Sequence, residues 1–165
     1  MKKPEKLETG RVTTGWREWL ALPELGIPAI KAKLDTGART SALHTFSIES
    51  FHSHGRPKVR FGIHPLQKRR DIELFCVADV VDRRVVSDSG GHRELRYVIS
   101  TPIQLGDTMW PIEITLTNRD TMLFRMLIGR SAMRDRLIVD PDSSYLTGRS
   151  LARSYPKAGK PRRKT

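Results

Sequence analysis

In the stretch "AIKAKLDTGARTSALH", residues 29–44, an apolar-alternating run ends on an aspartate. Ile30, Ala32 and Leu34 would lie on one face of an extended chain, as in a half-buried strand. Asp35 follows directly, and Gly37 permits a tight loop with close approach of the backbone. The stretch therefore predicts a strand that presents one carboxylate in a loop at its end.

A carboxylate presented in this way is suited to activating water. Thr36 offers a hydroxyl that can tie the loop to a neighbour, and the small Ala38 leaves room for a substrate. The apolar strand before the loop is expected to bury it and to raise the cost of ionising Asp35. One aspartate alone would be a weak catalyst, whereas two facing carboxylates that share a proton provide an acid and a base. The chain has no internal repeat that would supply the second aspartate.

Length and charge predict one folded domain followed by a basic segment. The 165 residues are 38% apolar and 29% charged, and the formal net charge is +12. Seven of the lysines and arginines, and no acidic residue, lie in residues 149–165. A segment of Pro, Gly, Ser and basic residues buries too little apolar surface to order itself. We expect a flexible N-terminus at 1–10, a domain at 11–148 and a disordered tail at 149–165.

The basic tail has two interpretations. It can hold the protein near nucleic acid, a ribosome or an acidic partner through counterion release, or it can be a solubilising tail without a partner. The single cysteine, Cys76, rules out a disulfide framework and a thiolate zinc cluster, which fits a reducing cytosol. The N-terminus lacks the apolar core of a signal peptide, and no apolar run approaches the roughly 20 residues of a membrane span. The sequence therefore predicts a soluble, cytoplasmic protein with no membrane association.

Short strands are predicted along most of the chain. The candidate strands, separated by turn sequences such as "HSHGRPK", "SDSGGH" and "LGDT", are residues 11–22, 29–35, 45–52, 58–64, 71–81, 93–100, 101–106, 110–119, 123–129 and 137–141. "WREWLALPEL" also fits helical spacing, but we favour a strand. One short helix is predicted at 130–136. This pattern is typical of an all-β barrel or sandwich.

Two signatures resemble those of retropepsin-like aspartic proteases. "LDTGA", residues 34–38, is similar to their catalytic signature, and "MLIGRSAM", residues 126–133, is similar to the second, in which apolar residues precede Gly-Arg and a short helix. The fuller pattern, "GWREWLALPELGIPAIKAKLDTGARTSALH" and later "LIGRSAMRDRLIVDP", resembles small bacterial and archaeal proteins often labelled ATP-dependent zinc proteases. Several of those lie beside an ATP-grasp ligase that adds glutamates to a ribosomal protein. The resemblance covers residues 12–147.

The resemblance implies a fold and a set of roles. The fold would be a retropepsin-like closed barrel, a single lobe with one short C-terminal helix. Asp35 would be the catalytic aspartate, Thr36 would hold its loop across a dimer axis, and Gly37 would shape the loop and face the substrate. Residues 127–129 would pack beneath the loop, and Ala38 would face the substrate. The hairpin at 87–92, with Gly90 and Gly91 at its tip, is our candidate flap, although a plain surface hairpin has the same sequence features.

Arg39 departs from the retroviral pattern. The residue four positions after the catalytic aspartate is acidic in retroviral enzymes and pairs with the arginine of the second signature, here Arg130. Arg130 therefore loses that partner unless Asp135 or Asp140 replaces it. If Arg39 and Arg130 both line the groove, they would favour an acidic or glutamate-rich peptide, because each can bind a carboxylate bidentately. The alternative is that Arg39 forms a structural salt bridge.

The label of those relatives, an ATP-dependent zinc protease, has no support in the residues themselves. The chain has no Gly-rich loop with Lys-Ser/Thr and no His-Glu-x-x-His pair. His44, His52 and His54 could contribute to a metal site, but paired histidines in a turn are more often solvated, and three ligands at a known spacing are not visible. We therefore predict neither a metal nor another cofactor.

Three functions follow as hypotheses. The first is an aspartic endopeptidase, a hydrolase in which two chains each contribute Asp35 to a homodimer that cuts acidic peptides or a modified ribosomal protein. The second is an inactive module of the same fold that binds a ribosome or RNA. The third is a metal-dependent hydrolase that uses Asp35 and nearby histidines. Because each chain has one such loop, the first hypothesis requires that the protein form a homodimer.

Overall fold

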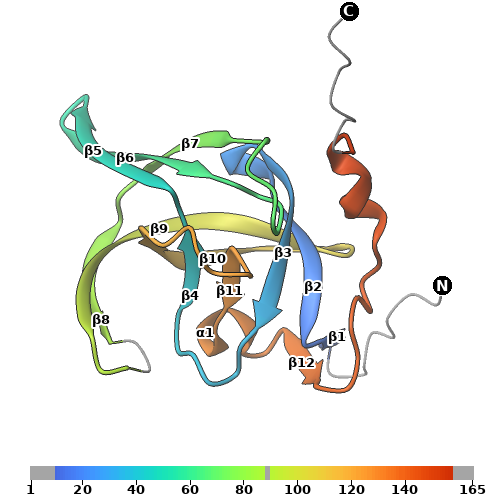
Figure 1. Ribbon diagram of the computed structural model, residues 1–165. Helices are drawn as coiled ribbons and strands as arrows, with labels where there is room; N and C mark the ends of the chain where they lie inside the picture. The colour runs from blue at the N-terminus through green and yellow to red at the C-terminus, as the bar shows by residue number, and fades with distance from the viewer. Residues whose placement is uncertain (1–9, 88–89, 158–165) are drawn as a thin grey trace, which may run out of the picture.

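The computed structural model describes residues 10–87 and 90–157, and Figure 1 traces the chain. Within them the elements are β1 (Val12–Gly15), β2 (Arg17–Leu22), η1 (Pro23–Leu25), β3 (Ile27–Leu34), β4 (Ser41–His44), β5 (Ser47–Ser53), β6 (Arg56–Ile63), β7 (Leu74–Asp79), β8 (Asp82–Ser87), β9 (Arg93–Leu105), β10 (Thr108–Thr117), β11 (Met126–Ile128), α1 (Arg130–Met133), β12 (Leu137–Asp140) and η2 (Ser150–Ser154). The predicted all-β class and the short helix after Gly129 are both confirmed. The expected flexible N-terminus lies almost wholly outside the described residues.

The main sheet has seven strands and curls back on itself. Its order is β10-β4-β11-β3-β2-β9-β8, and β9 also pairs with β10. This extra pairing makes a ring through six of the strands, as the curved ribbons of Figure 1 show. Among the described residues, one pair, Ala21 with Gln104, joins β2 to β9. The expected closed barrel is therefore a partly closed ring, narrowly joined at this link.

Several strands differ from the predicted ones. Residues 93–106 form one strand, β9, instead of two, because its antiparallel ladder with β10 continues through Pro102 opposite Pro111. Residues 11–22, predicted as one strand, form β1 and β2, with a break at Trp16. β8 was not predicted as a strand, and the same is true of β4. β4 pairs parallel with β10 and antiparallel with β11, and all four of its residues are buried.

The interior of the ring holds the Asp35 loop in place. Leu20, Ile30, Leu43, Ile99 and Ile114 are fully buried within it. On β3, Ile30, Ala32 and Leu34 are all buried, as their alternation predicts. β11 pairs parallel with β3 and places Ile128 beside Leu34, the last residue before the loop. The fold thus brings the two signatures of the sequence side by side at one end of the ring.

The residues after β12 pack against the domain. Glu18 is fully buried and accepts hydrogen bonds from the amides of Gly15, Leu146 and Thr147 at 2.7–3.0 Å. Further along, η2 leads to Tyr155, whose hydroxyl donates to the carbonyl of Ala29. The expectation of disorder is therefore wrong for residues 149–157, because Tyr155 anchors this segment to β3. Residues 158–165 of the predicted tail lie outside the described residues.

The remaining sheets and surfaces add less to the site. β5, β6 and β7 form a second, three-stranded sheet, and β1 pairs parallel with β12.

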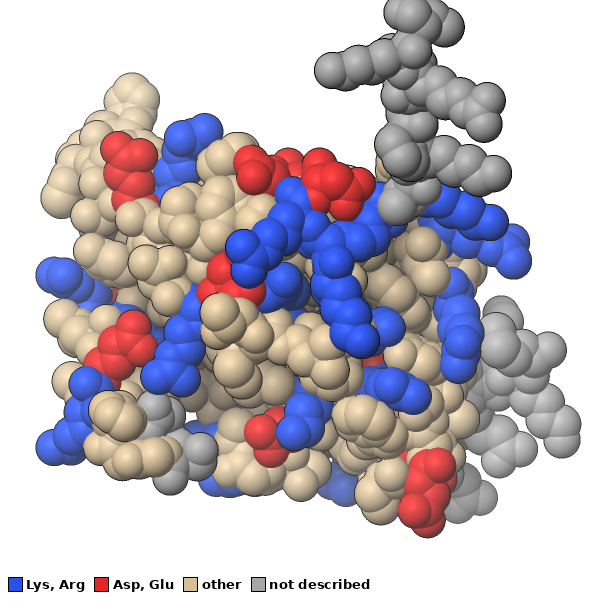
Figure 2. Space-filling model, viewed as in Figure 1, with Lys and Arg blue, Asp and Glu red and all other residues tan. Residues whose placement is uncertain are grey.

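Cys76 is buried on β7, where burial raises the pKa of its thiol to about 12. Lys and Arg side chains spread over the face shown in Figure 2, with acidic side chains in smaller groups. No helix in the described part of the chain is long and apolar enough to cross a membrane.

Candidate active site

The Asp35 loop is held by backbone hydrogen bonds at its start and by its own carboxylate. The amide of Asp35 donates to the carbonyl of Ile128 at 2.9 Å, and the amide of Ala38 donates to the carbonyl of Asp35 at 3.2 Å. The amide of Gly37 donates to Oδ1 of Asp35 at 2.9 Å. Asp35 is half-buried, less than its sequence predicts, and one carboxylate oxygen is fixed by the turn that carries it.

The second signature braces the same loop from beneath. The amide of Arg130 donates to the carbonyl of Ala38 at 2.8 Å, and the amide and hydroxyl of Ser131 both donate to the carbonyl of Arg39 at 3.0 and 2.8 Å. The guanidinium of Arg130 donates to the carbonyl of Thr36 at 2.9 Å. The first two residues of α1 therefore bind three carbonyls of the loop and fix its course.

Gly129 makes this contact possible. A Cβ atom at this position would lie 2.5–2.8 Å from backbone atoms of Thr40, closer than Cβ atoms pack. Its amide donates to the hydroxyl of Ser41 at 3.1 Å. Glycine is therefore required at this position by close approach of two backbone segments, and not by its dihedral angles, which are extended.

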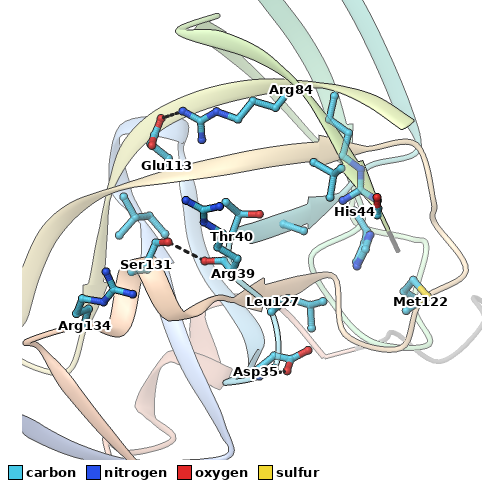
Figure 3. Close-up of a pocket in the computed structure, with 18 of the residues that line it drawn as sticks. Asp35, Arg39, Thr40, His44, Arg84, Glu113, Met122, Leu127, Ser131 and Arg134 are labelled. Carbon is cyan, nitrogen blue, oxygen red and sulfur yellow. Dashed lines mark hydrogen bonds and ion pairs between the residues drawn. The ribbon is translucent and has the colours of Figure 1, made fainter. Parts of the chain in front are cut away.

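The Asp35 loop borders a large cavity of about 1180 Å³. In Figure 3, Asp35 and Leu127 lie on one side of it and the Arg84–Glu113 pair on the opposite side, with Ser131 and Arg134 towards one end and His44 and Met122 towards the other. The walls come from β4, β8, β9, β10, β11 and α1, so the ring and the second signature together shape the space. Its volume is above the roughly 300–1,000 Å³ that is typical of small-molecule sites.

The cavity wall is rich in arginine. It contains the six arginines Arg39, Arg84, Arg96, Arg119, Arg134 and Arg136, and the two acids Asp35 and Glu113. Arg84 is 2.7 Å from both Asp82 and Glu113, so Glu113 is neutralised. Asp35 has no ion pair with any residue that the structure describes. The cavity therefore combines one unpaired carboxylate with an excess of positive charge.

The structure separates the two arginines that the sequence suggested for the groove. Arg39 lines the cavity, its side chain is exposed, and it has no ion pair within residues 10–87 and 90–157. Arg130 instead lines a smaller cavity on the other side of the loop, together with Thr36. Asp135, one of the acids suggested for Arg130, pairs with Arg11 at 3.2 Å. The prediction that both arginines line one groove is therefore wrong. Arg39 lines the large cavity, whereas the Arg130 side chain binds the carbonyl of Thr36 in the loop.

The hairpin proposed as a flap lies beside the cavity. β8 and β9 pair from Asp82 to Ser87, and residues 84–87 of β8 line the cavity. Gly91 adopts φ +82°, which suits a tight turn, and Gly90 is exposed. Residues 88 and 89 at the tip lie outside the described residues. The hairpin is thus confirmed, whereas its role as a flap stays a prediction.

His44 is a cavity residue that the sequence interpretation missed. It is only 5% exposed, its Nδ1 lies 2.6 Å from the hydroxyl of Thr117, and its Nε2 has no hydrogen-bond partner among the described residues. Burial, and then the positive charge of nearby arginines, lowers its pKa to about 4. The sequence could suggest only a metal ligand, since nothing in it shows that β4 pairs with β10 and carries His44 to the cavity wall.

The histidines do not assemble as a metal site. His52 and His54 are exposed at the end of the β5–β6 hairpin, away from the buried position of His44 on β4. Over the described parts of the chain, no group of three or more His, Cys, Asp or Glu side chains could hold a metal ion.

Comparison with known proteins gives one family and several relatives. The model of the family described as "Retropepsin-like aspartic endopeptidase RimB" matches residues 13–150. The chain is 52% identical over 134 residues to a Shewanella pealeana protein, and 47% identical over 147 residues to a Desulfotalea psychrophila protein, each named "Probable alpha-L-glutamate ligase". These matches cover 81% and 87% of this chain, but the chain spans only about a third of those relatives, 29% and 32% of their length.

A solved structure shows the same fold. It is the crystal structure of a Legionella pneumophila protein of unknown function, and it is 29% identical to this chain with a TM-score of 0.67. The match covers 82% of this chain and 97% of the Legionella chain.

Proposed function

Because this chain belongs to the RimB-like family of retropepsin-like aspartic endopeptidases, we propose that it is an aspartic peptidase in which two copies each contribute Asp35 to one active site. The observation that carries the proposal is the Asp35 loop itself. Its carboxylate is fixed by the amide of Gly37, has no ion pair with a described residue, and borders the large cavity. One such loop per chain makes a symmetric partner necessary for a two-carboxylate site.

In the proposed mechanism the two Asp35 carboxyl groups share one proton. The protonated group donates a hydrogen bond to the scissile carbonyl, while the ionised group takes a proton from the attacking water. The water oxygen bonds to the carbonyl carbon, the C–N bond then breaks, and the departing nitrogen receives a proton. No covalent intermediate forms, and neither a metal nor another cofactor is needed.

The charge of the cavity supports an acidic peptide as the substrate. The described wall has six arginines and two acids, and one of these acids, Glu113, is paired with Arg84, so the wall carries an excess of positive charge beside Asp35. Arg39 lies four residues from Asp35 and is free of ion pairs with described residues, so it can contact a substrate side chain close to the scissile bond. A guanidinium binds a carboxylate through two parallel hydrogen bonds.

The names of the relatives support a glutamate-rich substrate in particular. About two thirds of each "Probable alpha-L-glutamate ligase" lies outside the match, so we place the ligase activity of those proteins in that other part. The matched part, and this chain, would then hydrolyse the kind of bond that the rest forms. A protein carrying added glutamates, such as a modified ribosomal protein, is the proposed natural substrate.

Replacement of Asp35 by asparagine tests the mechanism. The asparagine amide oxygen can keep the hydrogen bond from the amide of Gly37, but the side chain cannot act as a base or share a proton. The variant should fold and associate like the wild type, measured by circular dichroism and sedimentation, and should lose cleavage of a glutamate-rich peptide, measured by mass spectrometry. A Glu24→Gln variant, which changes an exposed carboxylate outside the cavity, should cleave normally. Cleavage by Asp35→Asn at the wild-type rate would reject the mechanism.

A further inference from the structure

We propose that His44, together with Arg96 and Arg119, forms an anion-binding subsite at one end of the cavity, where it recognises a side-chain carboxylate of the substrate. The inference deepens the proposed function and rests on it for the nature of the ligand, a peptide. It assigns specificity to residues that lie on β4, β9 and the segment after β10, apart from the Asp35 loop.

The unpartnered nitrogen of His44 is the first support. Buried polar groups nearly always have a hydrogen-bond partner, and one without a protein partner calls for a water, a ligand or a functional role. His44 is 5% exposed, is held at Nδ1 by Thr117, and lines the cavity, yet its Nε2 has no partner in the described part of the chain. A substrate group reaching this end of the cavity would satisfy Nε2.

The hydrogen bond at Nδ1 determines what Nε2 can bind. Among the described residues the hydroxyl of Thr117 has no other acceptor, so it is best satisfied by donating to Nδ1 of His44. The neutral ring then carries its proton on Nε2. The low pKa of His44 keeps the ring neutral at pH 7, so Nε2 is a single N–H donor, the complement of a carboxylate oxygen.

The surrounding charges select for an anion. Arg96 is 9% exposed and lies directly opposite Arg84 in the β8–β9 ladder, so two guanidinium groups meet at this part of the wall. Arg84 is offset by Asp82 and Glu113, and Arg96 contacts the half-exposed Glu94 at 3.3 Å. Arg119 also lines the cavity, and both Arg96 and Arg119 are close enough to lower the pKa of His44.

Arg125 does not belong to the subsite, although it also lowers the pKa of His44. It is buried, lies 3.4 Å from Asp120, and donates to the carbonyl of Met122 at 3.0 Å. The Arg125 guanidinium therefore pairs with Asp120 and holds the segment that carries Met122 to the cavity. Arg96, Arg119 and the Nε2–H of His44 are the groups that we assign to the carboxylate.

The test is a binding measurement in the Asp35→Asn protein, so that the peptide is not cut. Fluorescein-labelled hexaglutamate, amidated at its C-terminus, is titrated and followed by fluorescence anisotropy, with amidated hexaglutamine as the uncharged peptide. His44→Asn keeps an amide near the position of Nδ1, next to Thr117, but has no group at the position of Nε2. His44→Gln reaches that position with an amide.

We expect His44→Asn and Arg119→Gln each to weaken hexaglutamate binding by roughly tenfold, the effect of losing one charge-assisted hydrogen bond. Hexaglutamine binding should not change, and His44→Gln should retain more affinity for hexaglutamate than His44→Asn. Arg56→Gln removes an exposed positive charge on β6, outside the cavity, and should bind both peptides like the parent protein.

Two results would overturn the subsite. One is unchanged hexaglutamate binding by a folded His44→Asn protein; if that variant does not fold, unchanged binding by Arg119→Gln decides in its place. The other is an equal loss for Arg56→Gln and Arg119→Gln, which would indicate general attraction by a basic surface. Neither result depends on cleavage. A wild-type protein that binds hexaglutamate but cleaves no peptide would reject the peptidase proposal and leave the subsite intact.

Discussion

Asp35 and Arg39 belong to one loop but have different surroundings. The Asp35 carboxylate is fixed by the turn, whereas the Arg39 side chain extends from the loop with only its carbonyl held, by Ser131. A side chain of this kind can adjust to a ligand without disturbing the Asp35 loop. Single substitutions at Asp35 and at Arg39 can therefore test peptide hydrolysis and the preference for acidic substrates separately.

Arg39→Asp is expected to change substrate preference without destroying the site. Reversal of this charge should lower the ratio of kcat/KM for acidic over neutral peptides by at least about tenfold, because a bidentate carboxylate contact is replaced by repulsion. Competition between a glutamate-rich peptide and its glutamine counterpart measures the ratio. Arg56→Asp makes the same change of charge outside the cavity and should leave the ratio intact. An unchanged preference in Arg39→Asp would remove Arg39 from substrate recognition.

His44 should make the protein less stable in acid. Its pKa in the folded protein, about 4, lies below the ordinary value of 6.5, so the unfolded chain takes up a proton first as the pH falls. This contribution to stability is complete above pH 6.5 and is lost progressively towards pH 4. Between about pH 7 and about pH 5 the loss is about 2 kcal/mol. Urea unfolding of wild type and His44→Asn at both pH values measures it.

Comparing the change in unfolding free energy between the two pH values in wild type and in His44→Asn separates the effect of His44 from other effects of acid. His44→Asn has no group at this position that titrates in this range, so its stability should fall less between the two pH values than that of the wild type. His52→Asn, at an exposed position of β5, should keep the wild-type dependence. Equal losses in wild type and His44→Asn would mean that His44 is not protected from protonation by the fold.

Among the contacts between elements, the one between the Asp35 loop and the start of α1 holds the loop in position. Gly129→Ala would push a methyl group into the backbone of Thr40, which must move and take the loop with it. We expect a loss of stability of about 1–3 kcal/mol together with a loss of peptide cleavage. Thermal unfolding and the cleavage assay follow the two effects separately.

Gly26→Ala provides the matched comparison for this contact. Gly26 has φ +72°, so alanine is strained there, but no atom lies within 4 Å of the added Cβ. This variant should lose stability, by roughly 1 kcal/mol, and keep its activity. If Gly129→Ala cleaved as well as Gly26→Ala at equal stability, the close approach at Thr40 would not position Asp35.

The sequence was informative where a local pattern determines the structure. The alternation of β3 and the two glycine-containing signatures indicated the loop, the residues beneath it and the helix after Gly129, because each depends on neighbouring residues. Long-range pairing was not visible in the same way. β4 was missed because four consecutive buried residues, with strands on either side, show no alternation. His44 was missed as a cavity residue for the same reason.

At the scale of the whole molecule, the ring leaves the Asp35 loop at its end, with Thr36 and Gly37 exposed. Leu34 and Ile128 fix the loop from inside, so its outer side is open to a second copy. A two-carboxylate site assembled in this way would be lost completely when one of the two aspartates is replaced, since both protonation states are needed at once.

Mixing wild type with Asp35→Asn therefore tests how many chains make one site. If subunits exchange freely and every site needs both aspartates, activity should fall with the square of the wild-type fraction, so that equal amounts leave about a quarter of the activity. If one chain suffices, activity should fall in proportion, to about half. The total concentration is kept constant, and sedimentation equilibrium verifies that the two proteins associate equally. A proportional fall, with exchange demonstrated by mass spectrometry of mixed dimers, would move the second catalytic group back into the same chain and reject the shared site.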